Sequence, residues 1–180
     1  RQSMNGPQLR VDYELFDVTS QKKVFSGYEA GAVSESVSKH TGIADCAGEV
    51  YEHITGTPGA FATKLLYISA TRVPGANEYS RLTMSDSDGA RPVVLLETRE
   101  PLLAPTWSPD AKEIAYVSFE TGRPAIYRQE LATGRRQQLT NFKGLNGAPS
   151  WSPDGRTMAM TLSKDGNPDI YLMDLATKQL

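Results

Sequence analysis

Two histidines, His40 and His53, and one cysteine, Cys46, are the side chains best suited to nucleophilic or general-base chemistry in this sequence of 180 residues. Cys46 and His53 lie in a segment with helical spacing, which places them on one face but about 10.5 Å apart along the helix axis. That separation is too long for a hydrogen bond between a nucleophile and its base. Glu49 lies at i, i+4 from His53, and a solvated ion pair on the helix surface explains this spacing. We therefore expect no catalytic residue here.

A second candidate is the acidic run Asp-Ser-Asp-Gly at residues 86–89, which resembles the start of a calcium-binding loop and has Glu97 at the twelfth position. Such a loop needs an oxygen ligand at its fifth position and glycine at its sixth, where this sequence has Ala90 and Arg91. An Asp-Gly hairpin turn explains the run better. We expect neither a metal nor a cofactor.

The overall composition excludes several further classes of protein. The chain has 19 basic and 21 acidic residues, a net charge of −2 and a pI near 5.7, so it lacks the basic excess typical of nucleic-acid binding. Its longest aliphatic run, at residues 93–96, is far shorter than a membrane span. We expect no nucleic-acid partner and no direct insertion into a membrane. Cys46 is the single cysteine, so no internal disulfide forms.

The strongest pattern is an internal repeat. Residues 105–133 align without a gap on residues 149–177, 44 positions later, with 13 identities in 29 positions. Each copy has Trp-Ser-Pro-Asp near its start, at Trp107 and at Trp151, and ends with Leu-Ala-Thr. These segments lack the apolar stripe of a helical repeat, so the repeating unit is predicted to be a set of strands.

Short strands separated by turn residues fill each copy. In the first copy, residues 113–119 and 125–131 are rich in β-branched and aromatic residues, and the residues before Trp107 and at 136–140 complete a set of four strands. In the Ser-Pro-Asp turn, proline fixes φ and the aspartate can accept a backbone hydrogen bond. Four strands with a period in the forties are typical of a β-propeller blade.

A third and looser copy precedes these two. Its strands are expected at residues 64–69, 80–85 and 91–96, and Asp88-Gly89 supplies a hairpin turn. It has no Trp-Ser-Pro-Asp block, and departures of this kind are common in terminal repeats.

Residues before about 60 follow a different pattern. Residues 11–15 alternate as a half-buried strand does, residues 23–28 can pair with them as a hairpin, and residues 41–55 have the apolar spacing of a helix. The sequence therefore predicts an α/β segment over 1–60 and an incomplete propeller over 61–180. The predicted blades lie at about 61–98, 99–142 and 143–180.

The repeated tryptophans can be aromatic platforms for a ligand, but their recurrence at the repeat period favours packing between units. Function is then expected in the loops. In an antiparallel blade, the connection from the second to the third strand and the connection to the next blade emerge at one end. These segments are residues 100–104, 120–123, 142–148 and 164–167. Their residue types suit a protein-binding or peptide-binding surface, and ordinary solvated loops are the alternative.

Several blocks occur together and in order: Glu-Val-Tyr-Glu-His-Ile-Thr-Gly at 49–56, Gly-Ala-Phe-Ala-Thr at 59–63, Pro-Thr-Trp-Ser-Pro-Asp at 105–110 and Asn-Gly-Ala-Pro at 146–149. This combination covers nearly the whole chain and resembles the TolB family, soluble periplasmic components of the Tol-Pal system of Gram-negative bacteria. Trp-Ser-Pro-Asp alone is less specific, because it also occurs in propellers attached to serine peptidases.

The resemblance implies an N-terminal α/β domain followed by a six-bladed β-propeller, so this sequence would be a fragment holding the end of the first domain and the first blades. It also implies a periplasmic protein without enzymatic activity that supports outer-membrane integrity and envelope constriction at division. The implied partners are the lipoprotein Pal, bound through one propeller face, and TolA, bound through an N-terminal extension that no residue of this sequence matches.

In the family, the Asn-Gly-Ala-Pro loop belongs to the Pal-binding face, which is the end already favoured by strand connectivity. The partner-binding residues that we expect on this face are Leu145, Asn146, Gly147, Ala148, Pro149, Glu120, Arg123, Leu103 and Ala104. Leu145 departs from the family pattern, in which histidine is frequent before the asparagine.

A different class stays open on the sequence alone. The propeller could gate a prolyl-oligopeptidase-like serine peptidase whose catalytic domain follows residue 180. A Gly-x-Ser-x-Gly motif downstream would favour the peptidase, whereas further repeats would favour the binding module.

Overall fold

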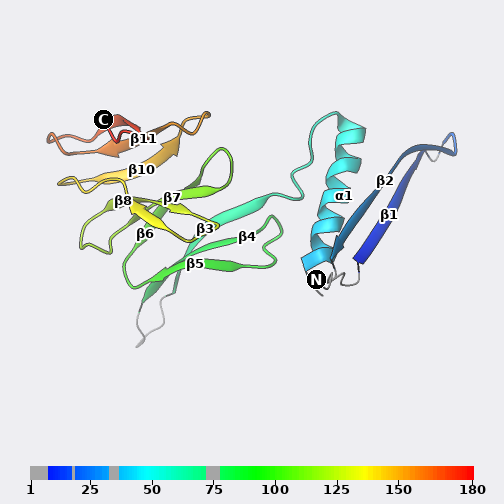
Figure 1. Ribbon diagram of the computed structural model, residues 1–180, viewed down its shortest axis with the longest axis horizontal. Helices are drawn as coiled ribbons and strands as arrows, with labels where there is room; N and C mark the ends of the chain where they lie inside the picture. Colours follow the sequence, from blue (N-terminus) through cyan, green and yellow to red (C-terminus); the bar gives the residue numbers. More distant parts are fainter. Residues whose placement is uncertain (1–7, 18, 33–36, 72–77) are drawn as a thin grey trace, which may run out of the picture. The chain divides into compact units, whose positions relative to one another are not determined.

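A computed structural model describes residues 8–17, 19–32, 37–71 and 78–180 (Figure 1). Two compact units make up the chain: Arg1–Lys64 with Asp86–Ala90, and Leu65–Ser85 with Arg91–Leu180. The predicted domain boundary at residue 60 and the predicted blade limits stay predictions.

The first unit contains a hairpin and a helix. Strands β1 (Gln8–Asp17) and β2 (Lys22–Ala32) pair antiparallel, as predicted, with a bulge between Leu15 and Phe16. Helix α1 (Val37–Thr55) begins four residues before the predicted residue 41, and these four residues, Val-Ser-Lys-His, precede the apolar stripe on which the prediction depended. It packs against the hairpin, where the rings of His53 and Phe25 stack with centroids 4.8 Å apart.

Among the described residues, no helix combines the length and apolar content that a membrane crossing requires.

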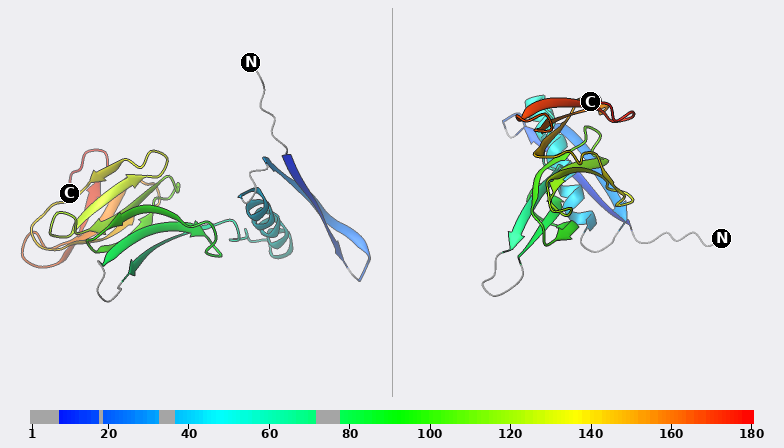
Figure 2. Two further views of the ribbon diagram at one scale, coloured as in Figure 1. Left: turned by 90° about the horizontal axis from the view of Figure 1, so that it is seen from below. Right: turned by 90° about the vertical axis from the view of Figure 1, so that its left-hand side faces the viewer.

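The second unit is built from antiparallel sheets in which consecutive strands are neighbours (Figure 1, Figure 2). The first sheet has β3 (Lys64–Thr71), β4 (Tyr79–Asp86) and β5 (Val93–Thr98). The second has β6 (Leu102–Trp107), β7 (Glu113–Ser118), β8 (Ala125–Glu130) and β9 (Arg136–Gln138). The third has β10 (Asn146–Trp151), β11 (Thr157–Leu162) and β12 (Asp169–Asp174).

The predicted strands are confirmed, with two informative differences. β5 begins at Val93 rather than at the predicted residue 91, because Arg91 has a left-handed φ of 50°, outside the range of a strand, and Pro92 has no N–H to donate to a neighbouring strand. β9 ends at Gln138 rather than at residue 140, since the Thr140 hydroxyl accepts the hydrogen bond of the Ile126 N–H at 3.0 Å in place of a regular strand pairing. The Asp-Gly hairpin turn is also confirmed: the Gly89 N–H donates to Asp86 O at 2.9 Å.

The apolar cores of the second unit lie between sheets. One cluster joins Leu82 of β4 to Leu102, Ile114 and Tyr116 of the next sheet, and Trp107 packs against it. The other cluster joins β7 and β8 to the methionines of β11 and β12, and Trp151 packs against it. The packing role predicted for both tryptophans is confirmed.

The Ser-Pro-Asp turns repeat one hydrogen-bond network. Ser108 Oγ donates to Asp110 Oδ1 at 2.7 Å and accepts from the Glu113 N–H at 2.9 Å. In the next repeat, Ser152 Oγ donates to Asp154 Oδ1 at 2.5 Å and also accepts from the backbone five residues on, at 2.9 Å. The serine hydrogen bonds, with the backbone bond each aspartate accepts, lower the pKa of both aspartates. The role predicted for aspartate is confirmed, because Asp110 and Asp154 accept backbone hydrogen bonds at 3.2 and 3.0 Å, and the serine hydroxyl completes the network.

Replacing the buried serine of the first turn tests this network. In the intact protein, Ser108→Ala removes both bonds of a hydroxyl on a residue that is 5% exposed, so we expect a loss of about 1–2 kcal/mol in the free energy of unfolding. Urea unfolding measures it. Ser150→Ala, at an exposed serine of β10, is the matched control and should change stability by less than about 0.5 kcal/mol. Equal losses in both variants would contradict the network.

Candidate functional site

Four connections meet at one end of the sheets in the second unit: residues 99–101, 119–124, 139–145 and 163–168. We call this end the loop face. Hydrogen bonds link the connections in pairs: the Phe119 N–H donates to Pro101 O at 3.2 Å, and Arg123 Nε donates to Asn141 Oδ1 at 3.0 Å. The structure therefore brings together the loops that strand connectivity assigned to one end.

Asn146 is fully buried and holds the β9–β10 connection in shape. Its Oδ1 accepts from the Phe142 N–H at 3.2 Å, and its Nδ2 donates to Phe142 O at 2.8 Å and to Gly144 O at 3.2 Å. With an exposed fraction of 0%, this side chain offers no surface to a partner. Asn146 is therefore a positioning residue for the loop, a role that the sequence alone did not distinguish from direct contact.

Leu145 is the exposed apolar side chain of this connection. Its side chain is 42% exposed, while hydrogen bonds to Ser163 of the neighbouring connection hold its backbone. The Leu145 N–H donates to Ser163 Oγ at 2.7 Å, and the Ser163 N–H donates to Leu145 O at 3.1 Å. The geometry thus combines an apolar surface with a constrained backbone.

Ala104 and Ala148 occupy equivalent repeat positions and share an unusual backbone. Their φ angles are 48° and 49°, and each precedes a proline inside a bulge of β6 or β10. A left-handed φ at a residue with a Cβ costs about 1 kcal/mol, so the surrounding sheet must hold this shape. Both alanines are exposed, and Leu103 beside the first is 51% exposed. Gly147 is half-buried and Pro149 is buried.

Glu120 and Arg136 form an ion pair that joins the loop face to β9. Arg136 Nη2 donates to Glu120 Oε2 at 2.7 Å, and Arg136 Nε donates to the hydroxyl of the fully buried Tyr116 at 2.7 Å. Burial opposes ionisation of Glu120, but the hydrogen bonds from Arg136, Tyr127 and Ser118 outweigh it and lower its pKa. Burial and the bond to Glu120 raise the pKa of Tyr127 to about 12.

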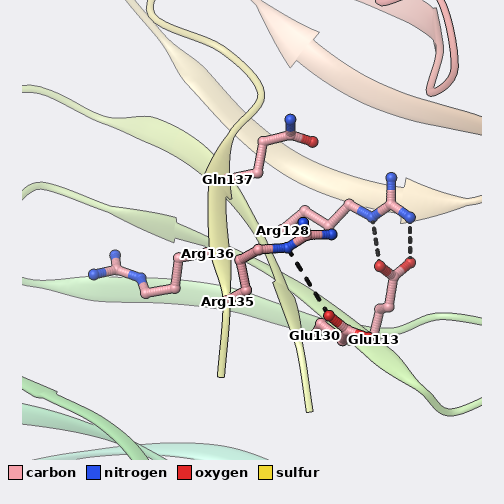
Figure 3. Close-up of a pocket in the computed structure, with 6 residues that line it drawn as sticks. All are labelled: Glu113, Arg128, Glu130, Arg135, Arg136 and Gln137. Atoms are coloured by element: carbon pink, nitrogen blue, oxygen red, sulfur yellow. Dashed lines mark hydrogen bonds and ion pairs between the residues drawn. The ribbon is translucent and has the colours of Figure 1, made fainter. Parts of the chain in front are cut away.

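A hollow of about 260 Å³ lies beside β8 and β9 (Figure 3). Arg128 donates two hydrogen bonds to the Glu113 carboxylate, from Nε at 2.9 Å and from Nη2 at 2.6 Å. Arg135 Nε lies 3.9 Å from Glu130 Oε2. Figure 3 shows Arg136 pointing away from the Arg128 pair, and its partner is Glu120. Each arginine of the hollow thus has a carboxylate partner, so the charges there are balanced.

The residues first considered for chemistry lie outside these features. In the first unit, Cys46 is half-buried and His53 stacks on Phe25. Over the described ranges, no three His, Cys, Asp or Glu side chains gather as ligands for a metal ion.

Ser163 and Arg136 are the functional candidates that sequence reasoning missed. The sequence feature that could have found them is a difference between equivalent repeat positions. Ser163 is equivalent to Phe119, and Arg136 is equivalent to Leu180, each pair being 44 positions apart. Positions that differ between otherwise matched repeats are free of the constraint that the repeat imposes.

Antiparallel sheets that share cores with their neighbours and gather their connections at one end define a partial β-propeller. The family described as the TolB beta propeller domain matches residues 51–180. The chain belongs to this TolB propeller family. The predicted fold class, an α/β segment followed by part of a propeller, is confirmed.

Two similar proteins are both named TolB. The Tol-Pal system protein TolB of Pseudomonas aeruginosa is 50% identical over 143 residues, which cover 79% of this chain and 32% of that protein. The crystal structure of TolB from Acinetobacter baumannii has 45% identity and a TM-score of 0.83, covering 99% of this chain and 43% of that one. The chain thus spans about a third of the length of the curated relative.

A peptidase propeller shares the fold at much lower similarity. A solved acylaminoacyl peptidase matches with a TM-score of 0.50 and 15% identity, covering 65% of this chain and 22% of that one. This likeness shows the propeller fold alone.

Removing the Asn146 amide tests its positioning role. Asn146→Ala leaves three loop backbone groups without their partner, so we expect a loss of about 1–3 kcal/mol in the free energy of unfolding. Amide hydrogen exchange at residues 142–145 should also accelerate. Asn167→Ala, at an exposed asparagine of the same face, should change neither quantity measurably. Unchanged exchange in Asn146→Ala would contradict the role.

Lowering the pH tests the Glu120–Arg136 pair. Because the folded-state pKa of Glu120 is lowered, its stabilisation is complete above the unfolded-state pKa of about 4.5 and is lost as the pH falls through the folded-state value. We expect Glu120→Gln to cost less than about 1 kcal/mol at pH 7, because the pair is partly exposed. The difference from the parent should shrink below pH 4.5, as measured by urea unfolding. Glu100→Gln is the exposed control, and a difference independent of pH would contradict the assignment.

Proposed function

We propose that this chain is part of a non-catalytic periplasmic protein-binding module of the Tol-Pal system. The module binds the lipoprotein Pal through the loop face and TolA through an N-terminal extension, and it supports outer-membrane integrity and envelope constriction at division. Residues 1–60 are the C-terminal part of the N-terminal α/β domain, and residues 61–180 are the first propeller blades.

The observation that carries this proposal is the likeness to TolB along the whole chain. The solved TolB from Acinetobacter baumannii covers 99% of the chain at 45% identity. The Asn-Gly-Ala-Pro block begins β10, directly after the connection at residues 139–145 of the loop face. The gating propeller of a peptidase has weaker support, because its likeness is confined to the fold at 15% identity.

The candidate residues divide into two groups by their burial. The exposed group can contact Pal directly, and the buried group sets the shape of the surface. The exposed residues are Leu103, Ala104, Glu120, Arg123, Leu145 and Ala148. Asn146 and Pro149 are buried, and Gly147 is half-buried between the two groups.

Binding of the intact protein to purified Pal from the same organism tests the proposal. Leu145→Arg places a charge where an apolar contact forms, so we expect the Kd for Pal to rise at least about tenfold. Isothermal titration calorimetry at low salt measures it. Failure of the unaltered protein to bind Pal would overturn the proposed function.

A matched variant at the other end of the sheet controls for general effects of added charge. Ala132 is exposed in the turn between β8 and β9, away from the loop face. Ala132→Arg should leave the affinity for Pal unchanged. A loss equal to that of Leu145→Arg would contradict a binding surface on the loop face.

A further inference from the structure

We propose that the connections at residues 139–145 and 163–168 form one preorganised docking platform for Pal, with Leu145 as its apolar anchor and Ser163 as the positioning residue of that anchor. The inference rests on the proposed function and adds the chemistry of the contact: the bound protein places an apolar side chain on Leu145. It also assigns a role to Ser163, which makes no contact with the partner and affects binding only by holding Leu145 in place.

Ser163 fixes both backbone groups of Leu145. Its hydroxyl accepts the Leu145 N–H at 2.7 Å, and its own N–H donates to Leu145 O at 3.1 Å. A residue held at both its donor and its acceptor loses little further conformational freedom when a partner binds. We call these two hydrogen bonds the brace. The brace fixes the position of Leu145 before the partner binds.

The preceding repeat has no counterpart of the hydrogen bond to the Ser163 hydroxyl. One period earlier, Phe119 and Pro101 occupy the positions of Ser163 and Leu145, and the Phe119 N–H donates to Pro101 O at 3.2 Å. The second bond has no counterpart there, because proline lacks an N–H and phenylalanine lacks a hydroxyl. The propeller architecture thus needs the backbone bond alone, and the added bond is free to serve another purpose.

Gly144 allows the two connections to approach closely. It has a φ of 84°, and a Cβ built on it would lie 2.3 Å from Ser163 Oγ. Any larger residue would therefore collide with the hydroxyl that holds Leu145 and would also strain the backbone.

The apolar core and Asn146 also hold the platform in place. Phe142 packs against the core cluster shared by the second and third sheets, and the buried Asn146 binds Phe142 and Gly144 through their backbone groups. The connection is thus tied to the core on one side and to Ser163 on the other. Its stiffness comes from contacts within the protein.

Leu145 presents its apolar surface on this rigid base. Its side chain is 42% exposed, and its Cδ1 would lie 3.7 Å from a Cβ added to Gly147. Glycine at position 147 thus leaves one flank of the leucine uncovered. Covering such a side chain with an apolar group of a partner is favourable, and a residue ordered in advance makes an effective anchor.

A double-mutant cycle in the intact protein tests the platform, with the Kd for purified Pal as the readout. Leu145→Ala should weaken binding about tenfold, and Ser163→Ala should weaken it about three- to tenfold. The double variant should bind within about twofold of Leu145→Ala, because Ser163 acts through Leu145. Ser163→Thr retains the hydroxyl and should bind within about twofold of the parent protein. Full affinity in Ser163→Ala, or losses that multiply in the double variant, would overturn the proposal.

Hydrogen exchange in the free protein provides a second and independent readout. Ser163→Ala should accelerate exchange of the Leu145 amide, whereas Ser163→Thr and the control Ser150→Ala should not. Slow exchange in Ser163→Ala would overturn the brace whether or not Pal binds. If the unaltered protein does not bind Pal, the proposed function fails and takes the docking role with it, while the exchange data still decide the brace.

Discussion

In the described part of the second unit, no sheet has an apolar core of its own, and this constraint governs the rest of the structure. Each core cluster combines residues from two consecutive sheets: Leu82 with Ile114 in one, and Val117 with Met160 in the other. A sheet is therefore stable only beside its neighbours, as in other repeat architectures. The repeated tryptophans pack against these clusters, which explains their recurrence at the period of 44 residues.

This constraint separates the two ends of the sheets. At the turn end, both repeats use the same Ser-Pro-Asp network with nearly identical distances, because both turns must start the second strand of a sheet in the same way. At the loop end, equivalent positions differ: Pro101 corresponds to Leu145, and Phe119 to Ser163. The shared turn network is therefore part of the architecture, whereas the differing residues at positions 145 and 163 give the loop face of the last repeat a surface of its own.

The sequence predicted the parts of the fold that depend on local patterns. The repeat and its turn residues predicted the strands of the three sheets, the packing of Trp107 and Trp151, and the hairpin turn at Asp86. Its errors were at ends: α1 starts earlier than the apolar stripe, and β9 stops where a threonine hydroxyl replaces a regular strand pairing. Side-chain hydrogen bonds of this kind leave no periodic signal.

The candidate site was predictable in position but not in its internal roles. Strand connectivity and the Asn-Gly-Ala-Pro block both indicated the loop face. The sequence could not show that Asn146 is buried while Leu145 stays exposed, because the two residues lie at the junction of an irregular connection and β10, where strand alternation does not yet apply. Nor could it pair Glu120 with Arg136, because the first lies in the connection between β7 and β8, the second lies in β9, and only the fold brings them together.

The central claim is that recognition belongs to the loop face while the turn end is architecture. Amide hydrogen exchange of the intact protein, with and without saturating Pal, tests this claim most directly. The account predicts slower exchange in the complex at residues 119–124 and 142–148, with no change in the turns at 108–112 and 152–156. Protection confined to those turns would contradict it.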